Sequence, residues 1–218
     1  LETLSAVGVS GLSVDLTTPD LVAELAASRW PVADTALLMA RLDRKDWGAL
    51  GGDEAPYRAL IDLAGPAASA LPALGRIAPE TAARLERLIA LLPNVRITID
   101  PTERHGFEYQ SWVGFSLFGS RDGTPLRGEI GRGGAYVVRH PDGRDEAAAG
   151  VSLYVDPLVD AGFGQQPRQR LFLPHGTATE TAARLRAEGW NTVQALSPTE
   201  LPASCTHVWN GTSAVARS

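Results

Sequence analysis

Two segments of this chain combine glycine with side chains that recognise small polar molecules. They contain Glu108, Tyr109, Gln110, Gly133, Gly134 and Tyr136. A carboxylate such as that of Glu108 accepts hydrogen bonds from an imidazole N–H or an ammonium group. Glycine removes side-chain bulk and lets another molecule approach the main chain. The pattern indicates a site for a ligand with an amine, a carboxylate and a flat ring. An ordinary twisted hairpin with a glycine bulge explains the same spacing.

The elements that position these residues are predicted to be neighbouring strands. Residues 109–118 alternate between apolar and small or polar types, which is the period of a strand. Residues 119–125 have turn chemistry, with Asp122-Gly123 at the centre. A return strand is predicted to start at residues 127–130 and to resume at residues 136–138 after the glycines.

Three motifs in this region resemble those of one family. Residues 105–115 read H-G-F-E-Y-Q-S-W-V-G-F and resemble the R-G-L-D-Y-Y-T-G-x-V-F signature of histidyl-tRNA synthetases and their paralogues. Residues 133–136 resemble the G-G-R-Y of that family's second histidine-specific motif. Residues 150–158 resemble G-F-A-M-G-L-E-R-L, the third class II synthetase motif. The resemblance covers roughly residues 1–162.

This chain departs from the family at the cations that the synthetase reaction uses. The arginines of the three motifs fall on His105, Ala135 and Pro157. A proline has neither charge nor donor and cannot replace a guanidinium on a triphosphate. An amino-acid site without its ATP half resembles the regulatory subunit of ATP phosphoribosyltransferase. That resemblance implies a non-catalytic subunit that supports the short catalytic subunit and its feedback control by histidine.

The resemblance also implies a set of histidine-binding residues. They are His105, Glu108, Tyr109, Gln110, Gly133, Gly134 and Tyr136. Gln110 stands where the family has a tyrosine. No catalytic residue, cofactor or metal is expected, and the implied partners are the short catalytic subunit, histidine as an effector and a second copy in a hetero-oligomer. A histidyl-tRNA synthetase-like enzyme and a stand-alone amino-acid-sensing module remain the alternatives.

The composition limits the cellular setting and the binding partners expected of this protein. Of 218 residues, 44% are hydrophobic and 21% charged, which predicts a globular core. The net charge of −5 and the lack of a basic run argue against nucleic-acid binding. Cys205 is the only cysteine, so a reducing cytoplasm is the expected setting, and no apolar run is long enough for a membrane span. The chain opens at Leu1 and lacks the family's first two motifs, so we expect it to be a fragment of a longer protein.

We predict an α+β fold in two parts. Residues 1–162 should form a class II synthetase-like, mostly antiparallel sheet, and residues 29–93 should be a helical insertion within it. Residues 169–218 should form a small C-terminal α/β lobe, with a parallel strand–helix–strand unit and a hairpin at Asn210-Gly211.

Local sequence signals predict the start of one helix and of one strand. Thr18 and Pro19 have the types preferred at the cap and the first position of a helix. Gly150 is predicted to begin the last strand of the core, with residues 144–146 lying in solvated surface before it.

Overall fold

The structure is a computed structural model that describes residues 1–92, 94–104, 110–164, 169–200 and 204–217. It divides into two compact units, residues 1–164 and residues 165–218. The described candidate residues all belong to the first unit, and the second unit has a sheet of its own.

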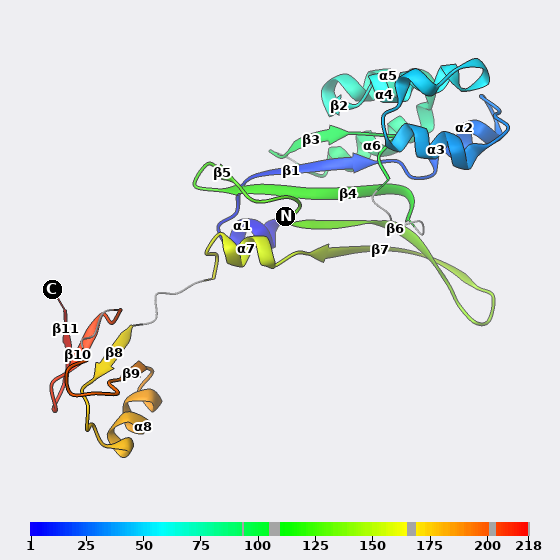
Figure 1. Ribbon diagram of the computed structural model, residues 1–218. Helices are drawn as coiled ribbons and strands as arrows, with labels where there is room; N and C mark the ends of the chain where they lie inside the picture. The colour runs from blue at the N-terminus through cyan, green and yellow to red at the C-terminus, as the bar shows by residue number, and fades with distance from the viewer. Residues whose placement is uncertain (93, 105–109, 165–168, 201–203, 218) are drawn as a thin grey trace. The chain divides into compact units, whose positions relative to one another are not determined.

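A seven-stranded sheet forms the first unit, in the order β2-β3-β1-β4-β6-β7 with β5 paired to β4 (Figure 1). Its strands are β1 (Ser10–Thr17), β2 (Gly65–Pro66), β3 (Arg96–Ile99), β4 (Gln110–Arg121), β5 (Thr124–Pro125), β6 (Gly131–Arg139) and β7 (Asp145–Leu153). β1 and β3 are parallel, and the other pairs are antiparallel. The prediction of a mostly antiparallel sheet is confirmed.

The register of the strands gives the sheet one polar and one apolar face. Residues directly opposite each other on paired strands lie on the same face, and neighbours along a strand alternate between faces. One cross-strand row consists of Thr98, Asp15, Ser116, Arg132 and Ser152. The next row consists of Ile99, Leu16, Phe115, Gly133 and Val151. The first row marks the polar face, and the second marks the apolar face.

Helices gather beside β1, β2 and β3 at one side of the sheet (Figure 1). They are α2 (Leu21–Ala27), α3 (Thr35–Asp43), η1 (Trp47–Ala49), η2 (Gly52–Tyr57), α4 (Arg58–Asp62), α5 (Ala67–Ile77) and α6 (Pro79–Ile89). Tyr57 is fully buried, meets the Trp30 ring edge-on at 5.2 Å, and donates its hydroxyl to the Trp30 carbonyl at 2.7 Å. Burial raises the pKa of the Tyr57 phenol. Two further helices, α1 (Glu2–Ala6) and α7 (Asp156–Asp160), complete the unit.

Three boundaries predicted from the sequence are wrong. The helix expected at Pro19 begins at Leu21, whose N–H donates to the carbonyl of Thr18, and the Thr18 side chain makes no cap. The return strand begins at Gly131 and not at Arg127, because the preceding residues form a connection rather than a ladder. β7 begins five residues before Gly150, since the turn after β6 lets the two strands pair directly.

Asp20 precedes α2 with its carboxyl group partly removed from water. Burial raises the pKa of this carboxyl above its ordinary value, and Arg84 lowers it to a smaller extent. A carboxyl with a raised pKa binds its proton more tightly in the folded state, so stability is lost as the pH rises through that pKa. We expect Asp20→Asn to raise the melting temperature at neutral pH by about 1–2 °C. Thermal unfolding below the ordinary pKa of aspartate should show no such gain, and an equal gain at both pH values would contradict this explanation.

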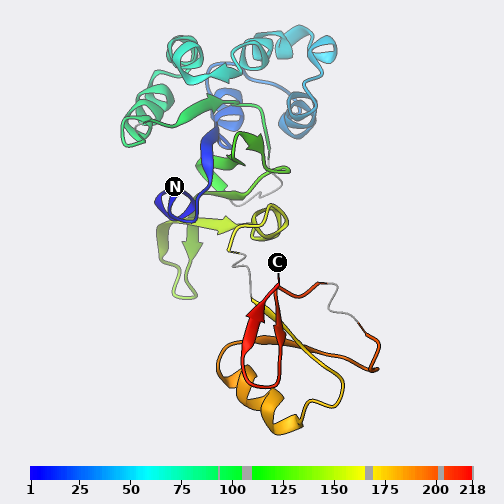
Figure 2. The same ribbon diagram turned by 90° about the vertical axis from the view of Figure 1, so that its left-hand side faces the viewer.

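The second unit is a four-stranded sheet in the order β11-β10-β8-β9 (Figure 2). Its elements are β8 (Arg170–Leu173), α8 (Thr179–Ala187), β9 (Asn191–Gln194), β10 (His207–Trp209) and β11 (Ala214–Ala216). β8 and β9 are parallel, and β10 and β11 form a hairpin at Asn210-Gly211, as predicted. Leu185 of α8 is buried together with Leu171 and Leu173 of β8 and with Trp209 of β10.

Candidate functional site

Four of the seven candidate residues line one hollow of about 510 Å³. They are Gln110 on β4 and Gly133, Gly134 and Tyr136 on β6. The other candidates, His105, Glu108 and Tyr109, lie outside the described residues. The strands therefore bring the described candidates together beside β7, which contributes Gly150 and Ser152 to the same hollow.

Gln110 holds β4 and β6 together at this place. Its side chain is buried, and its Nε2 donates to the carbonyl of Gly133 at 3.0 Å. Its amide lies over the polar face at Gly114 and Gly134, where β4 and β6 change register. The residue at the family's tyrosine position is thus fixed by the protein itself.

Gly133 and Gly134 lie on opposite faces of the sheet and have separate structural reasons to be glycine. A Cβ on Gly134 would lie 2.6 Å from the Val113 carbonyl oxygen and 3.0 Å from Nε2 of Gln110. A Cβ on Gly133 would lie 2.2 Å from the Gly150 carbonyl oxygen and 2.5 Å from Cζ of Phe115. Neighbouring groups of the protein therefore favour glycine at both positions, and the approach of a ligand to the main chain there stays a prediction.

An ion pair on the polar face was missed by sequence reasoning. Nη2 of Arg132 donates to both carboxylate oxygens of Glu129, at 2.7 and 2.6 Å, and Ser116 Oγ donates to Glu129 Oε1 at 2.9 Å. Arg132 also lines the hollow. Only the strand register could have indicated this contact, because Ser116 and Arg132 face each other only when β4 and β6 pair as they do. The Gln110 amide, the Tyr136 phenol, the Ser152 hydroxyl and the Arg132 guanidinium give the hollow donors and acceptors for a small zwitterionic ligand.

A second missed feature anchors the segment just before His105 to the helical region. Nζ of Lys45 donates to Asp100 Oδ1 at 3.1 Å, to Thr102 Oγ1 at 2.8 Å and to Glu103 Oε2 at 3.3 Å. The Arg104 N–H donates to Asp43 Oδ1 at 2.9 Å. This cluster, the Lys45 anchor, joins positions more than fifty residues apart, so no local pattern could predict it.

Two of the three positions where the family has arginines are described. Pro157 lies in the first turn of α7 and offers no side-chain donor. Ala135 pairs with Ala149 and lies on the apolar face. Neither position supplies a cation for a triphosphate.

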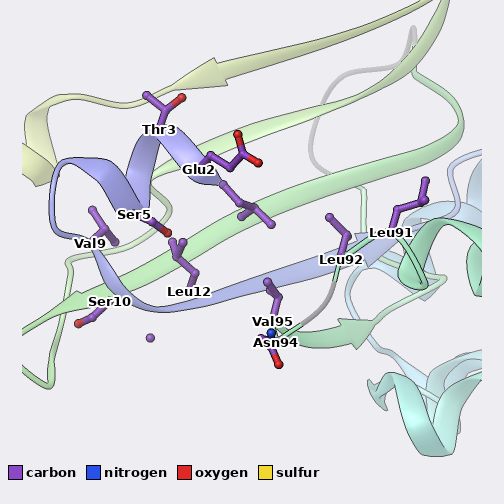
Figure 3. A pocket seen from close by; sticks show the side chains of 12 residues that line it. Glu2, Thr3, Ser5, Val9, Ser10, Leu12, Leu91, Leu92, Asn94 and Val95 are labelled. Carbon is purple, nitrogen blue, oxygen red and sulfur yellow. The ribbon is translucent and has the colours of Figure 1, made fainter.

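A second hollow, of about 760 Å³, lies between α1 and the connection from α6 to β3 (Figure 3). Glu2, Thr3 and Ser5 of α1 line one side, and Leu92 and Val95 line the other (Figure 3). Glu2 is the one charged side chain among the described residues that line it. None of the candidate histidine-binding residues contributes to this hollow.

Within the described ranges, no group of three or more His, Cys, Asp or Glu side chains could hold a metal ion. No helix in the same ranges is long and apolar enough to cross a membrane.

Solved structures define the class of fold. A Bacillus halodurans structure described as an ATP phosphoribosyltransferase regulatory subunit/histidyl-tRNA synthetase is similar with a TM-score of 0.59 and 21% identity, over 88% of this chain and 56% of that one. Histidyl-tRNA synthetase from Nostoc sp. is similar with a TM-score of 0.57 and 16% identity, over 92% of this chain and 56% of that one. The fold is that of a class II synthetase-like protein, as predicted.

The family follows from the sequence comparison. The histidyl-tRNA synthetase family model matches residues 1–158, and the chain belongs to this family. Curated relatives from Paramagnetospirillum magneticum and Rhodospirillum centenum are 41% and 38% identical over 92% and 95% of this chain. Both are named ATP phosphoribosyltransferase regulatory subunit. The chain spans about half the length of these relatives, 55% and 57% respectively.

Proposed function

We propose that this chain is part of a regulatory subunit of ATP phosphoribosyltransferase, acting in the first step of histidine biosynthesis. Its partner in this proposal is the short catalytic subunit, which the chain activates and makes sensitive to histidine. The similarity to relatives that carry this name, at up to 41% identity over nearly the whole chain, is the observation that carries the proposal. A solved ATP phosphoribosyl transferase complex from Thermotoga maritima shares the fold with a TM-score of 0.51 at 13% identity.

The chemistry of the site supports a role without catalysis. Adenylate formation needs cations against the triphosphate, and the family's arginines are replaced by His105, Ala135 and Pro157. The Arg132 guanidinium in the hollow is paired with Glu129. The proposal therefore includes no catalytic residue and no cofactor.

Histidine is the proposed effector, and the hollow beside β6 and β7 is its proposed site. Tyr136 and Gln110 would contact it there together with the candidates at 105, 108 and 109. We further propose a cytoplasmic hetero-oligomer that contains two copies of this subunit. Residues 1–162, with the insertion at 29–93, would form its synthetase-like core, and residues 169–218 its C-terminal lobe.

Calorimetric titration of histidine, with and without the short catalytic subunit, tests this proposal. We expect binding, histidine-dependent inhibition of the complex, and a loss of affinity of about tenfold or more in Glu108→Ala, which removes the proposed imidazole acceptor. Glu86→Ala removes an exposed carboxylate from α6 and serves as the matched control, with unchanged affinity expected.

Three results would contradict the proposed function in different ways. No complex with the catalytic subunit and no change in its activity would overturn the regulatory assignment. Histidine-dependent exchange of pyrophosphate into ATP would favour a histidyl-tRNA synthetase-like enzyme. Amino-acid binding without any effect on the transferase would favour a stand-alone sensing module.

A further inference from the structure

A small polar cavity lies between α2, α6 and β4, away from the hollow described above. Its volume is about 90 Å³, and its polar lining includes Thr18, Asp20, Glu24, Glu80 and Arg84. Trp112 of β4 closes one side. No described candidate for histidine binding lines this cavity.

One polar group of this cavity, the Thr18 hydroxyl, is buried without a partner among the described residues. Thr18 is only 2% exposed, and its Oγ1 is buried without a hydrogen-bond partner. Within the described ranges, the carboxylates of Asp20, Glu24 and Glu80 make no side-chain hydrogen bond or ion pair. A buried hydroxyl without a partner destabilises a protein, so this hydroxyl calls for an explanation.

The charges of the lining residues favour a ligand that is a positively charged hydrogen-bond donor. Three carboxylates and the hydroxyls of Thr18 and Thr81 provide acceptors. Arg84 is the single cation among the lining residues, which leaves two negative charges in excess. The Arg84 guanidinium lies 4.0 Å from the centre of the Trp112 ring, stacked on its face. These carboxylates form no metal-binding group in the described part of the chain, so an organic cation fits better than a metal ion.

We propose that this cavity binds the ammonium or guanidinium head of an organic cation. The volume corresponds to about three water molecules, enough for such a head and too small for a nucleotide or an aromatic amino acid. The head would donate to Thr18 Oγ1 and to the carboxylates, and the rest of its molecule would extend into solvent. This site is separate from the proposed histidine site, and its test does not depend on the catalytic subunit.

The test is an NMR titration of the protein with methylguanidinium chloride. The matched neutral probe is N-methylurea, which has nearly the same shape without the charge. We expect methylguanidinium to shift the Trp112 indole and Thr18 amide signals with saturation in the millimolar range, and N-methylurea to leave them unchanged. Equal shifts with both probes, or no saturable shift with either, would overturn the proposal.

Three substitutions test the proposal further. Glu80→Gln should weaken methylguanidinium binding about tenfold, whereas Glu86→Gln on the same helix should change it less than about twofold. Arg84→Ala should strengthen binding about threefold, because it removes a competing cation. Weaker binding in Arg84→Ala, with the Trp112 signal retained, would show that Arg84 does not compete with the bound cation and would overturn the proposal.

Thr18→Val separates a binding role from a structural one. Valine has the shape of threonine without the unpartnered hydroxyl, so the melting temperature should rise by about 2–4 °C while methylguanidinium affinity falls. A lower melting temperature would show that the hydroxyl serves the fold, contrary to the proposal.

A last comparison identifies the source of the cation. Equal affinity for free arginine and for arginine blocked at both ends supports a side chain presented by a partner protein. Free arginine that binds about tenfold more tightly supports a free small molecule. If neither form of arginine binds in the concentration range where methylguanidinium saturates, the cavity does not open to solvent as proposed, and the proposal is overturned.

Discussion

Gly133→Ala is expected to lower the free energy of unfolding of the first unit by about 3 kcal/mol or more. The new methyl group would lie 2.2 Å from the Gly150 carbonyl oxygen and 2.5 Å from the Phe115 ring. The ring could turn, but the carbonyl belongs to β7 and can move only if the β6–β7 ladder shifts. Urea unfolding followed by tryptophan fluorescence measures the change.

Gly150→Ala is the matched control on the neighbouring strand. Its methyl group would lie 3.4 Å from Cε1 of Tyr136, an ordinary contact, so a change within about 1 kcal/mol is expected. Because the protein has two units, the transition of the first must be separated from that of the second. Equal midpoints for the two variants would show that β6 and β7 are less rigidly paired than the structure indicates.

Local chemistry made several elements predictable from the sequence. The alternation in residues 109–118 predicted β4, and Asp122-Gly123 predicted the turn into β5. Asp122 and Gly123 have φ values of 50° and 81°, the left-handed pair that a two-residue hairpin requires. The parallel β8–β9 pair and the hairpin at Asn210-Gly211 depend on similar short-range signals.

Features that depend on register could not be predicted in the same way. Gly133 and Gly134 look equivalent in the sequence, yet one contacts Phe115 and the other contacts Gln110. Their faces are fixed by the shift in pairing between β4 and β6, which no single segment encodes. The start of β7 was missed for a related reason: Asp145 and Glu146 are exposed and charged, but they pair with β6 next to the turn that joins the two strands.

The candidate site was predictable in part. The resemblance selected Gln110, Gly133, Gly134 and Tyr136, which the fold places along one hollow. It did not indicate Arg132, because its partner Glu129 becomes relevant only once the connection before β6 is in place. The roles of all these residues toward histidine remain predictions.

The second large effect is expected at the Lys45 anchor. Lys45→Met keeps the length of the side chain but removes the cation that lies 2.9 Å from Asp100 Oδ2 and 3.3 Å from Glu103 Oε2. The two carboxylates would then face each other without a counter-charge, and Thr102 Oγ1 would lose a donor. Because Lys45 is a third exposed, solvent screens part of this cost, and we expect a loss of about 2 kcal/mol. Thermal unfolding should show a decrease of about 4–8 °C.

Arg41→Met provides the control, because Arg41 pairs with Glu54 inside the helical region and makes no hydrogen bond or ion pair with the described residues 100–104. It should cost less than about 1 kcal/mol. Lys45 is joined to the segment that leads directly into the candidate residues at 105–110, so Lys45→Met should also weaken histidine binding about tenfold if that segment forms the proposed site. Arg41→Met should leave the affinity unchanged. If the two variants weaken binding equally, the helical region acts on the site through its overall stability, and the Lys45 anchor has no positioning role.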